Sequence, residues 1–105
     1  MSWAQVIDED RVPREGGLRV DIGEHRIALF RVGGDIYAIG DRCSHAEASL
    51  SEGDVFDNEV ECPRHGSAFD ITTGEVLNLP ATQPVPTYEV KVEDGMVYLN
   101  IGEEE

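Results

Sequence analysis

Cysteine and histidine are scarce in this chain and unevenly placed. Its 105 residues include only two cysteines and three histidines. Four of these five residues form two compact pairs, Cys43-x-His45 and Cys62-x-x-His65, and the 16 residues 46–61 separate the pairs. Thiolates and imidazoles are common protein ligands of zinc and of iron–sulfur clusters. The two pairs therefore indicate a metal centre with four protein ligands.

The mixture of cysteine and histidine within each pair favours iron over zinc. Zinc fingers usually pair cysteine with cysteine and histidine with histidine. One class of binuclear iron–sulfur centre instead has two thiolates on one iron and two imidazoles on the other. Cys43 and His45 can reach neighbouring irons, because residues i and i+2 of an extended stretch point the same way. Structural zinc stays open as the alternative, and iron analysis would exclude it.

The sequence around these pairs resembles the Rieske [2Fe–2S] family signature. The segments 66–70 and 73–75 are similar to the run that follows the family's second cluster loop, and Gly66 would permit a tight backbone there. Leu79-Pro80-Ala81 resembles the family's proline-containing third loop, and the similarity extends roughly from Trp3 to Ile101. The resemblance implies one [2Fe–2S] cluster bound by Cys43, His45, Cys62 and His65.

Ser67 and Pro80 complete the cofactor site that the resemblance implies. Ser67 matches a serine that hydrogen-bonds a bridging sulfide in the respiratory branch of the family, whereas Phe69 replaces the assisting tyrosine. Hydrogen bonds to cluster sulfurs raise the reduction potential. We therefore expect a potential inside the Rieske span of roughly −150 to +300 mV, below its respiratory end.

The cysteine count separates this chain from the respiratory branch. Respiratory members carry a disulfide between the cluster loops, and its cysteines would fall at Ala48 and Arg64. The pattern instead resembles the soluble ferredoxins of bacterial ring-hydroxylating dioxygenase systems. That resemblance implies a one-electron carrier between a flavin-dependent reductase and a terminal oxygenase. The absence of further cysteines suits a reducing compartment, so we expect a cytoplasmic protein.

The histidine count argues against an enzyme. A Rieske oxygenase needs a separate mononuclear iron, typically bound by two histidines and a carboxylate. Once the cluster takes His45 and His65, only His25 remains, and we expect that residue at the surface. We therefore expect an electron-transfer protein. A small subunit or accessory module of a larger complex, such as an assimilatory reductase or an iron–sulfur assembly system, is the alternative.

The charge of the chain restricts its partners. Eight basic residues face 22 acidic ones, which gives a formal net charge of −14. Nucleic acid would repel such a surface. The charge either steers the protein towards basic docking faces or only maintains solubility. No stretch approaches the roughly 20 apolar residues of a membrane span, and no secretory signal is visible, so we expect no membrane association. We also expect a monomer.

Glycine, proline and short apolar runs indicate the fold class. We expect an all-β protein, a small Rieske-type antiparallel β-sandwich with a cluster-binding subdomain at one end. A single domain would cover residues 1–102, with the subdomain at about 41–80 and an acidic tail at 103–105. The predicted strands before the final hairpin are Trp3–Ile7, Leu18–Ile22, Arg26–Val32, Ile36–Ile39, Gly53–Phe56, Glu59–Cys62, Ala68–Asp70 and Glu75–Leu77.

The clearest element is a hairpin near the end of the chain. Apolar and charged residues alternate along Tyr88–Glu93, Asp94-Gly95 forms the turn, and alternation returns along Val97–Ile101. A short helical turn near Arg11–Glu15 is limited by Pro13. Five aromatic residues are expected in the core or at its edge: Trp3, Phe30, Tyr37, Phe56 and Tyr98.

Overall fold

The computed structural model describes residues 3–43, 48–64, 66–78 and 83–101. This part of the chain forms nine β-strands and two short 3₁₀ helices. All of its strand pairs are antiparallel, which confirms the predicted all-β class. The elements are β1 (Trp3–Asp8), η1 (Glu9–Arg11), β2 (Gly17–Ile22), β3 (His25–Val32), β4 (Asp35–Gly40), η2 (Leu50–Glu52), β5 (Asp54–Phe56), β6 (Glu59–Glu61), β7 (Ala68–Asp70), β8 (Thr87–Glu93) and β9 (Met96–Asn100).

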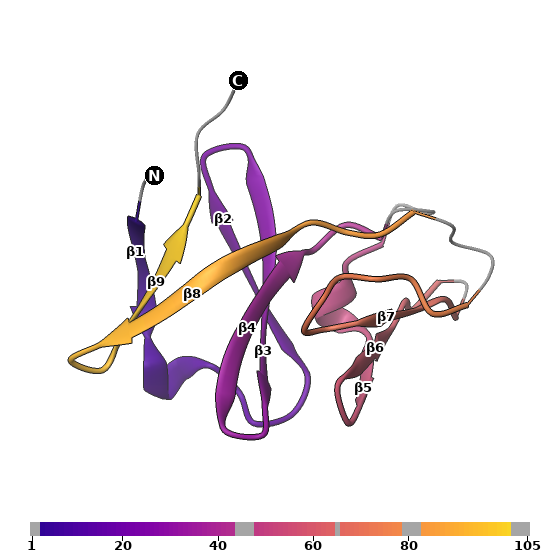
Figure 1. The fold of residues 1–105 in the computed structure, drawn as a ribbon, viewed down its shortest axis with the longest axis horizontal. Helices are drawn as coiled ribbons and strands as arrows, with labels where there is room; N and C mark the ends of the chain where they lie inside the picture. Colours follow the sequence, from indigo (N-terminus) through magenta and orange to yellow (C-terminus); the bar gives the residue numbers. More distant parts are fainter. Residues whose placement is uncertain (1–2, 44–47, 65, 79–82, 102–105) are drawn as a thin grey trace.

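The strands form two sheets. The larger sheet has the order β1-β9-β8-β4-β3-β2, and β5-β6-β7 form the smaller one at the right of Figure 1. Strand β8 pairs with β4 only through Ala38↔Tyr88 and Ile39↔Thr87, so the larger sheet consists of two halves. These halves share one core, which makes them the layers of a sandwich. Its buried residues are Val12, Ile27, Leu29, Ile36, Ala38, Val97 and Leu99.

Strand β3 separates this sandwich core from a second core. Its residues Ile27 and Leu29 face the sandwich, whereas Ala28 and Phe30 face the other way. A strand that is covered on both faces is apolar along its length, as the run from Ile27 to Phe30 is. The second core lies between β3, β4 and the smaller sheet. Its buried residues are Ala28, Phe30, Ile39, Cys43, Leu50, Val60, Cys62, Phe69, Ile71 and Val85.

Three predicted elements differ from the structure. The helical turn lies at Glu9–Arg11 and ends at Val12, whose backbone is extended because the residue before a proline avoids the helical region. The prediction of a strand at Glu75–Leu77 was wrong, since this segment meets β7 in a single bridge, Phe69↔Val76. Helix η2 (Leu50–Glu52) was not predicted.

The hairpin turn predicted at Asp94-Gly95 is present. Asp94 and Gly95 both have positive φ angles, as a two-residue turn between twisted strands requires. Asp57 also has a positive φ, at the turn from β5 to β6. Phe56 beside that turn is 59 % exposed, so its expected place in the core or at its edge was wrong. The reason is that Phe56 is the last residue of β5, a three-residue strand at the edge of the smaller sheet.

Among the described residues, no helix is long and apolar enough to cross a membrane.

Candidate metal centre

Cys43 and Cys62 begin two segments with the same closure. The backbone N–H of Cys43 donates to the carbonyl of Ala48 at 3.0 Å, and that of Cys62 donates to the carbonyl of Ser67 at 2.7 Å. Each bond joins a cysteine to the fifth residue after it. We call residues 43–48 the first loop and residues 62–67 the second loop. The first position of each loop is thus a thiol.

The residues that flank these loops pair in the same way. An antiparallel bridge joins Arg42 to Ser49 outside the first loop, and Glu61 pairs with Ala68 outside the second. Both loops are therefore the ends of hairpins. They also lie next to one another, because residues of both line one cavity of about 430 Å³. Its lining residues are Ala48, Ser49, Glu52, Pro63 and Arg64.

The two thiols fit a shared metal cluster. Cys43 is 2 % exposed and Cys62 is 1 % exposed, and both belong to the second core. They are not halves of a disulfide. Metal coordination removes the proton of a cysteine thiol, and the resulting thiolate is the metal ligand. Two sulfur donors at the same position of two adjacent loops can therefore bind one iron.

Three predicted site residues fall outside the described residues. His45 follows Cys43 within the first loop, His65 lies in the second loop, and Pro80 lies in the segment 79–82. The structure thus brings together the two predicted sulfur ligands. The two predicted nitrogen ligands and the role of Pro80 stay predictions.

Ser67 and Gly66 complete the described part of the second loop. Ser67 is fully buried and belongs to the same end of the molecule as Cys62. The backbone N–H of Gly66 donates to the carbonyl of Cys62 at 3.1 Å, and its φ angle is +79°. That angle is in the left-handed region, which only glycine adopts at no steric cost. The loop therefore depends on a glycine directly before Ser67, as the sequence indicated.

A polar cluster beneath the first loop was missed by sequence reasoning. Asp41 is fully buried, and its carboxylate accepts hydrogen bonds from the backbone of Ser51 at 2.9 Å and from Arg26 at 3.4 Å. Arg26 also donates to the hydroxyl of Ser49 at 3.1 Å. The only signal was an acidic residue just before a ligand loop. One of 22 acidic residues cannot be singled out on that ground.

The hairpin of the second loop is anchored at its far end by Asp70. The Asp70 carboxylate accepts hydrogen bonds from the hydroxyl and the backbone N–H of Thr72, at 2.7 and 2.8 Å. The Asn58 amide adds a third at 3.4 Å. The Thr72 hydroxyl is the main cause that lowers the Asp70 pKa below its usual value of 3.8, and the backbone N–H bonds add to it.

His25, the third histidine, packs against the sandwich. Its Nδ1 atom lies 3.3 Å from the hydroxyl oxygen of Tyr88, and the two rings meet edge to face with centroids 5.8 Å apart. The side chain is only partly exposed, so the expectation of a surface residue was too simple. This contact joins the start of β3 to β8.

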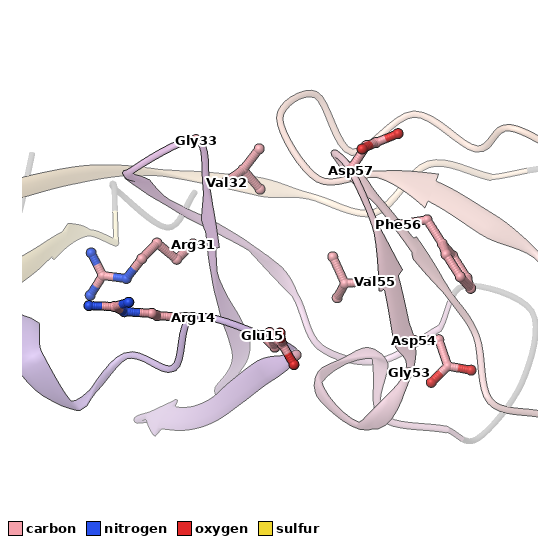
Figure 2. Close-up of a pocket in the computed structure, with 11 residues that line it drawn as sticks. Arg14, Glu15, Arg31, Val32, Gly33, Gly53, Asp54, Val55, Phe56 and Asp57 are labelled. Atoms are coloured by element: carbon pink, nitrogen blue, oxygen red, sulfur yellow. The ribbon is translucent and has the colours of Figure 1, made fainter.

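A larger cavity, of about 690 Å³, lies between the end of β3 and the edge strand β5. Figure 2 shows Val32 and Val55 facing one another across it, with Arg14 and Arg31 together at one end. Arg31 is held by the carbonyls of Glu9 and Val12, at 2.8 and 3.2 Å. Among the described residues that line this cavity there is no cysteine or histidine, so it is separate from the thiol pair.

Comparison with known proteins identifies similar chains. The family model of the Rieske [2Fe–2S] domain matches residues 2–89. The 3-phenylpropionate/cinnamic acid dioxygenase ferredoxin subunit of Escherichia coli strain K12 is 50 % identical over 93 residues, which cover 88 % of this chain and 87 % of that protein.

Solved structures agree with this result. The complex of reduced oxygenase and oxidised ferredoxin in carbazole 1,9a-dioxygenase contains a chain with a TM-score of 0.86 and 38 % identity, which covers 92 % of this chain and is itself fully covered. The ferredoxin of Sphingomonas yanoikuyae B1 has a TM-score of 0.90 and 28 % identity, over 96 % of this chain and all of that one.

Proposed function

The chain belongs to the Rieske [2Fe–2S] domain family, and from this premise we propose that it passes single electrons from a flavin-dependent reductase to a terminal oxygenase. It is a Rieske-type ferredoxin with one [2Fe–2S] cluster, an electron-transfer component of a dioxygenase system and not the catalytic enzyme. The observation that carries the proposal is the pair of buried thiols at matching positions of two adjacent loops.

Six residues form the proposed cofactor site. Cys43 and Cys62 would hold one iron, and His45 and His65 would hold the other. The equal closure of the two loops supports this assignment, because it gives each loop one sulfur ligand at its first position. Ser67 would donate a hydrogen bond to a cluster sulfide, and Pro80 would cover the cluster. When bound, the cluster supplies a one-electron redox couple.

The chain's own residues would hold this couple away from water on one side. The core around Cys43 and Cys62 includes Leu50, Val60 and Phe69, each fully buried. Such surroundings exclude solvent behind the thiolates and keep the cluster at the end of the molecule. We propose that residues 41–80 act as the cluster-binding subdomain of a single domain, 1–102, followed by the acidic tail 103–105.

The partners and location extend the proposal. A solved relative is named as a complex of oxygenase and ferredoxin, which supports an oxygenase as the electron acceptor. The net charge of −14 favours docking on a basic face of that acceptor. The donor is a flavin-dependent reductase, because an oxygenase system needs a source of single electrons. A cytoplasmic monomer fits a thiol pair that must stay reduced until it binds iron.

The test combines metal analysis with spectroscopy and electron transfer. The purified protein should contain two irons and two labile sulfides, and after dithionite reduction it should show a rhombic paramagnetic resonance signal. Cys43→Ser and Cys62→Ser should each lose the cluster, while the exposed substitution Asp21→Asn should keep it. Zinc in place of iron, or no electron transfer from the reduced protein to a dioxygenase component, would contradict the proposal.

A separate measurement tests Ser67. Ser67→Ala removes the hydroxyl and keeps the buried volume nearly unchanged. The reduction potential should fall, because a hydrogen bond to a cluster sulfur stabilises the electron-rich reduced state. Protein-film voltammetry would detect the shift, and an unchanged potential would refute the role assigned to Ser67.

A further inference from the structure

A buried carboxylate lies directly beneath the first loop. Asp41 directly follows the last residue of β4 and lies two residues before Cys43. Its side chain is fully buried, whereas the Arg26 side chain that contacts it is 34 % exposed. The Arg26 Nη2 atom lies 3.4 Å from Asp41 Oδ2. The pair thus reaches from the protein surface into the core that holds both cysteines.

All the polar groups of Asp41 have partners. Its backbone N–H donates to the carbonyl of Arg26 at 2.9 Å, and its carbonyl accepts the N–H of Leu50 at 2.6 Å. Its carboxylate accepts the N–H of Ser51 in addition to the Arg26 contact. Arg26 then binds the hydroxyl of Ser49 with the same nitrogen. These bonds tie β3 to the residues that flank the first loop on both sides, 41 and 49–51.

Stability alone does not account for this pair. Buried ion pairs lose hydration, and replacing them with apolar residues is often neutral or stabilising. Such a pair is therefore better explained by the single conformation that it specifies than by added stability. The Nε atom of Arg26 is also buried with no hydrogen-bond partner in the described part of the chain. A buried donor without a partner is unfavourable. An arrangement with such a cost indicates a requirement for charge and geometry at this point.

We propose that Asp41 and Arg26 form a positioning pair for the cluster, which holds Cys43 in place and whose two charges balance each other beneath the first loop. This inference rests on the proposed function, since it requires a cluster at Cys43. Neither residue is a ligand. The pair sets the reduction potential of the cluster in two ways, through the position of Cys43 and through its own two charges.

The two charges predict the direction in which each variant shifts the reduction potential, and a purely structural role would predict no such direction. Reduction adds one negative charge to the cluster site. Asp41→Asn leaves the Arg26 cation unbalanced, which favours the reduced state and raises the potential. Arg26→Met leaves the Asp41 anion unbalanced and lowers it. A loss of packing alone would not reverse sign between the two variants.

The experiment measures potential and iron release in the cluster-loaded protein. Asp41→Asn should shift the potential upwards, Arg26→Met downwards, and the double variant should return close to the wild-type value. Each single variant should release iron to a chelator about tenfold faster than wild type, because a buried pair that loses one partner is strongly destabilised.

A matched control is available on the surface. Arg19 and Asp21 form an exposed ion pair with an N–O distance of 3.1 Å, so Asp21→Asn removes the same charge from a solvated pair. Its potential and iron release should stay at the wild-type values. Arg26→Lys should also keep the potential, because the charge remains. It should release iron faster, because the lysine nitrogen is one bond nearer the backbone than the Arg26 Nη2 atom that reaches Asp41 and Ser49.

The outcomes separate this inference from the proposed function. If the wild-type protein binds no cluster, the proposed function fails. If it binds the cluster but the two single variants shift the potential in the same direction, or shift it no more than Asp21→Asn does, only the positioning pair is overturned. Should Asp41→Asn fail to take up a cluster, Arg26→Met and Arg26→Lys decide: a lower and an unchanged potential support the pair, and any other combination overturns it.

Discussion

The two loops that begin with cysteine are closed by equivalent backbone hydrogen bonds, but different interactions hold them in place. The second loop joins β6 to β7, and the paired residues Val60 and Phe69 beneath it are fully buried. Among the described residues, the first loop is followed by no strand, only by the single bridge from Arg42 to Ser49 and then η2. A backbone ladder therefore supports the second loop, whereas isolated backbone bonds and the side chains of Asp41 and Arg26 support the first.

The supports of the second loop extend across β7. The N–H of Ala68 donates to the side chain of Asn78 at 2.6 Å, and the N–H of Leu77 donates to the carbonyl of Ala68 at 2.8 Å. The bond to Asn78 needs that side chain, whereas the bond from Leu77, like the pairs between β6 and β7, joins backbone groups that many sequences could provide. The first loop also has backbone bonds, but the side chains of Asp41 and Arg26 add bonds that only these residue types make. Equivalent ligand positions can thus be built from generic and from residue-specific interactions.

The largest effect should come from the core that both loops share. Phe69→Ala should lower the free energy of unfolding by about 3–5 kcal/mol and Leu50→Ala by about 2–5 kcal/mol, since each leaves a cavity at a fully buried position. Denaturant unfolding would measure both. Phe56→Ala is the control, because this exposed phenylalanine on the same sheet should change stability by only about 0.5 kcal/mol. An equal loss of stability in Phe56→Ala would contradict the interpretation that both loops rest on one core.

The next largest loss of stability should come from a substitution where the segment after the first loop contacts the strands of the second. A Cβ atom at Gly53, which follows η2, would collide with the Glu61 carbonyl oxygen in β6. Gly53→Ala should therefore force the strands apart and cost about 1–3 kcal/mol, as overpacking does. Its backbone φ of −81° suits any residue, so the effect would be steric. Thermal unfolding would measure this loss. An unchanged melting temperature in Gly53→Ala would show that the segments supporting the two loops are independent.

A smaller effect should distinguish the second loop. Gly66→Ala meets no closer atom than the flexible end of Glu61 at 3.3 Å, so its cost comes from the positive φ angle. We expect about 1–2 kcal/mol and faster iron release. Gly66→Asn is the matched variant, because asparagine tolerates this conformation better. If alanine and asparagine behaved alike, backbone strain would not be the cause.

The smallest effect should appear at the far end of the second hairpin. Since the native pKa of Asp70 lies below 3.8, ionised Asp70 stabilises the fold above that value, and the contribution is lost as the pH falls through the native pKa. Asp70→Asn should cost about 1 kcal/mol at neutral pH. The difference in melting temperature from wild type should stay constant from pH 8 to about 5 and shrink below it. A difference that grew in acid would reverse the sign and refute the assignment.

Much of the fold followed from local patterns. Alternation predicted the final hairpin, and the scarce Cys43 and Cys62 were identified as a pair before their loops were seen side by side. The strand predicted at Glu75–Leu77 failed because a run of apolar residues does not reveal whether a neighbouring strand will pair with it. Phe56 was misplaced for a similar reason, since burial depends on what packs over an edge.

Ligand spacing and the left-handed turn at Gly66 belong to the sequence, because residue type and chain distance along a few positions determine them. The pairing of Asp41 with Arg26 belongs to the tertiary structure. These residues are 15 positions apart, and only the register of β3 against β4 brings them together beneath the first loop. Local chemistry therefore indicated which residues could bind a metal, and long-range packing decided what holds them in place.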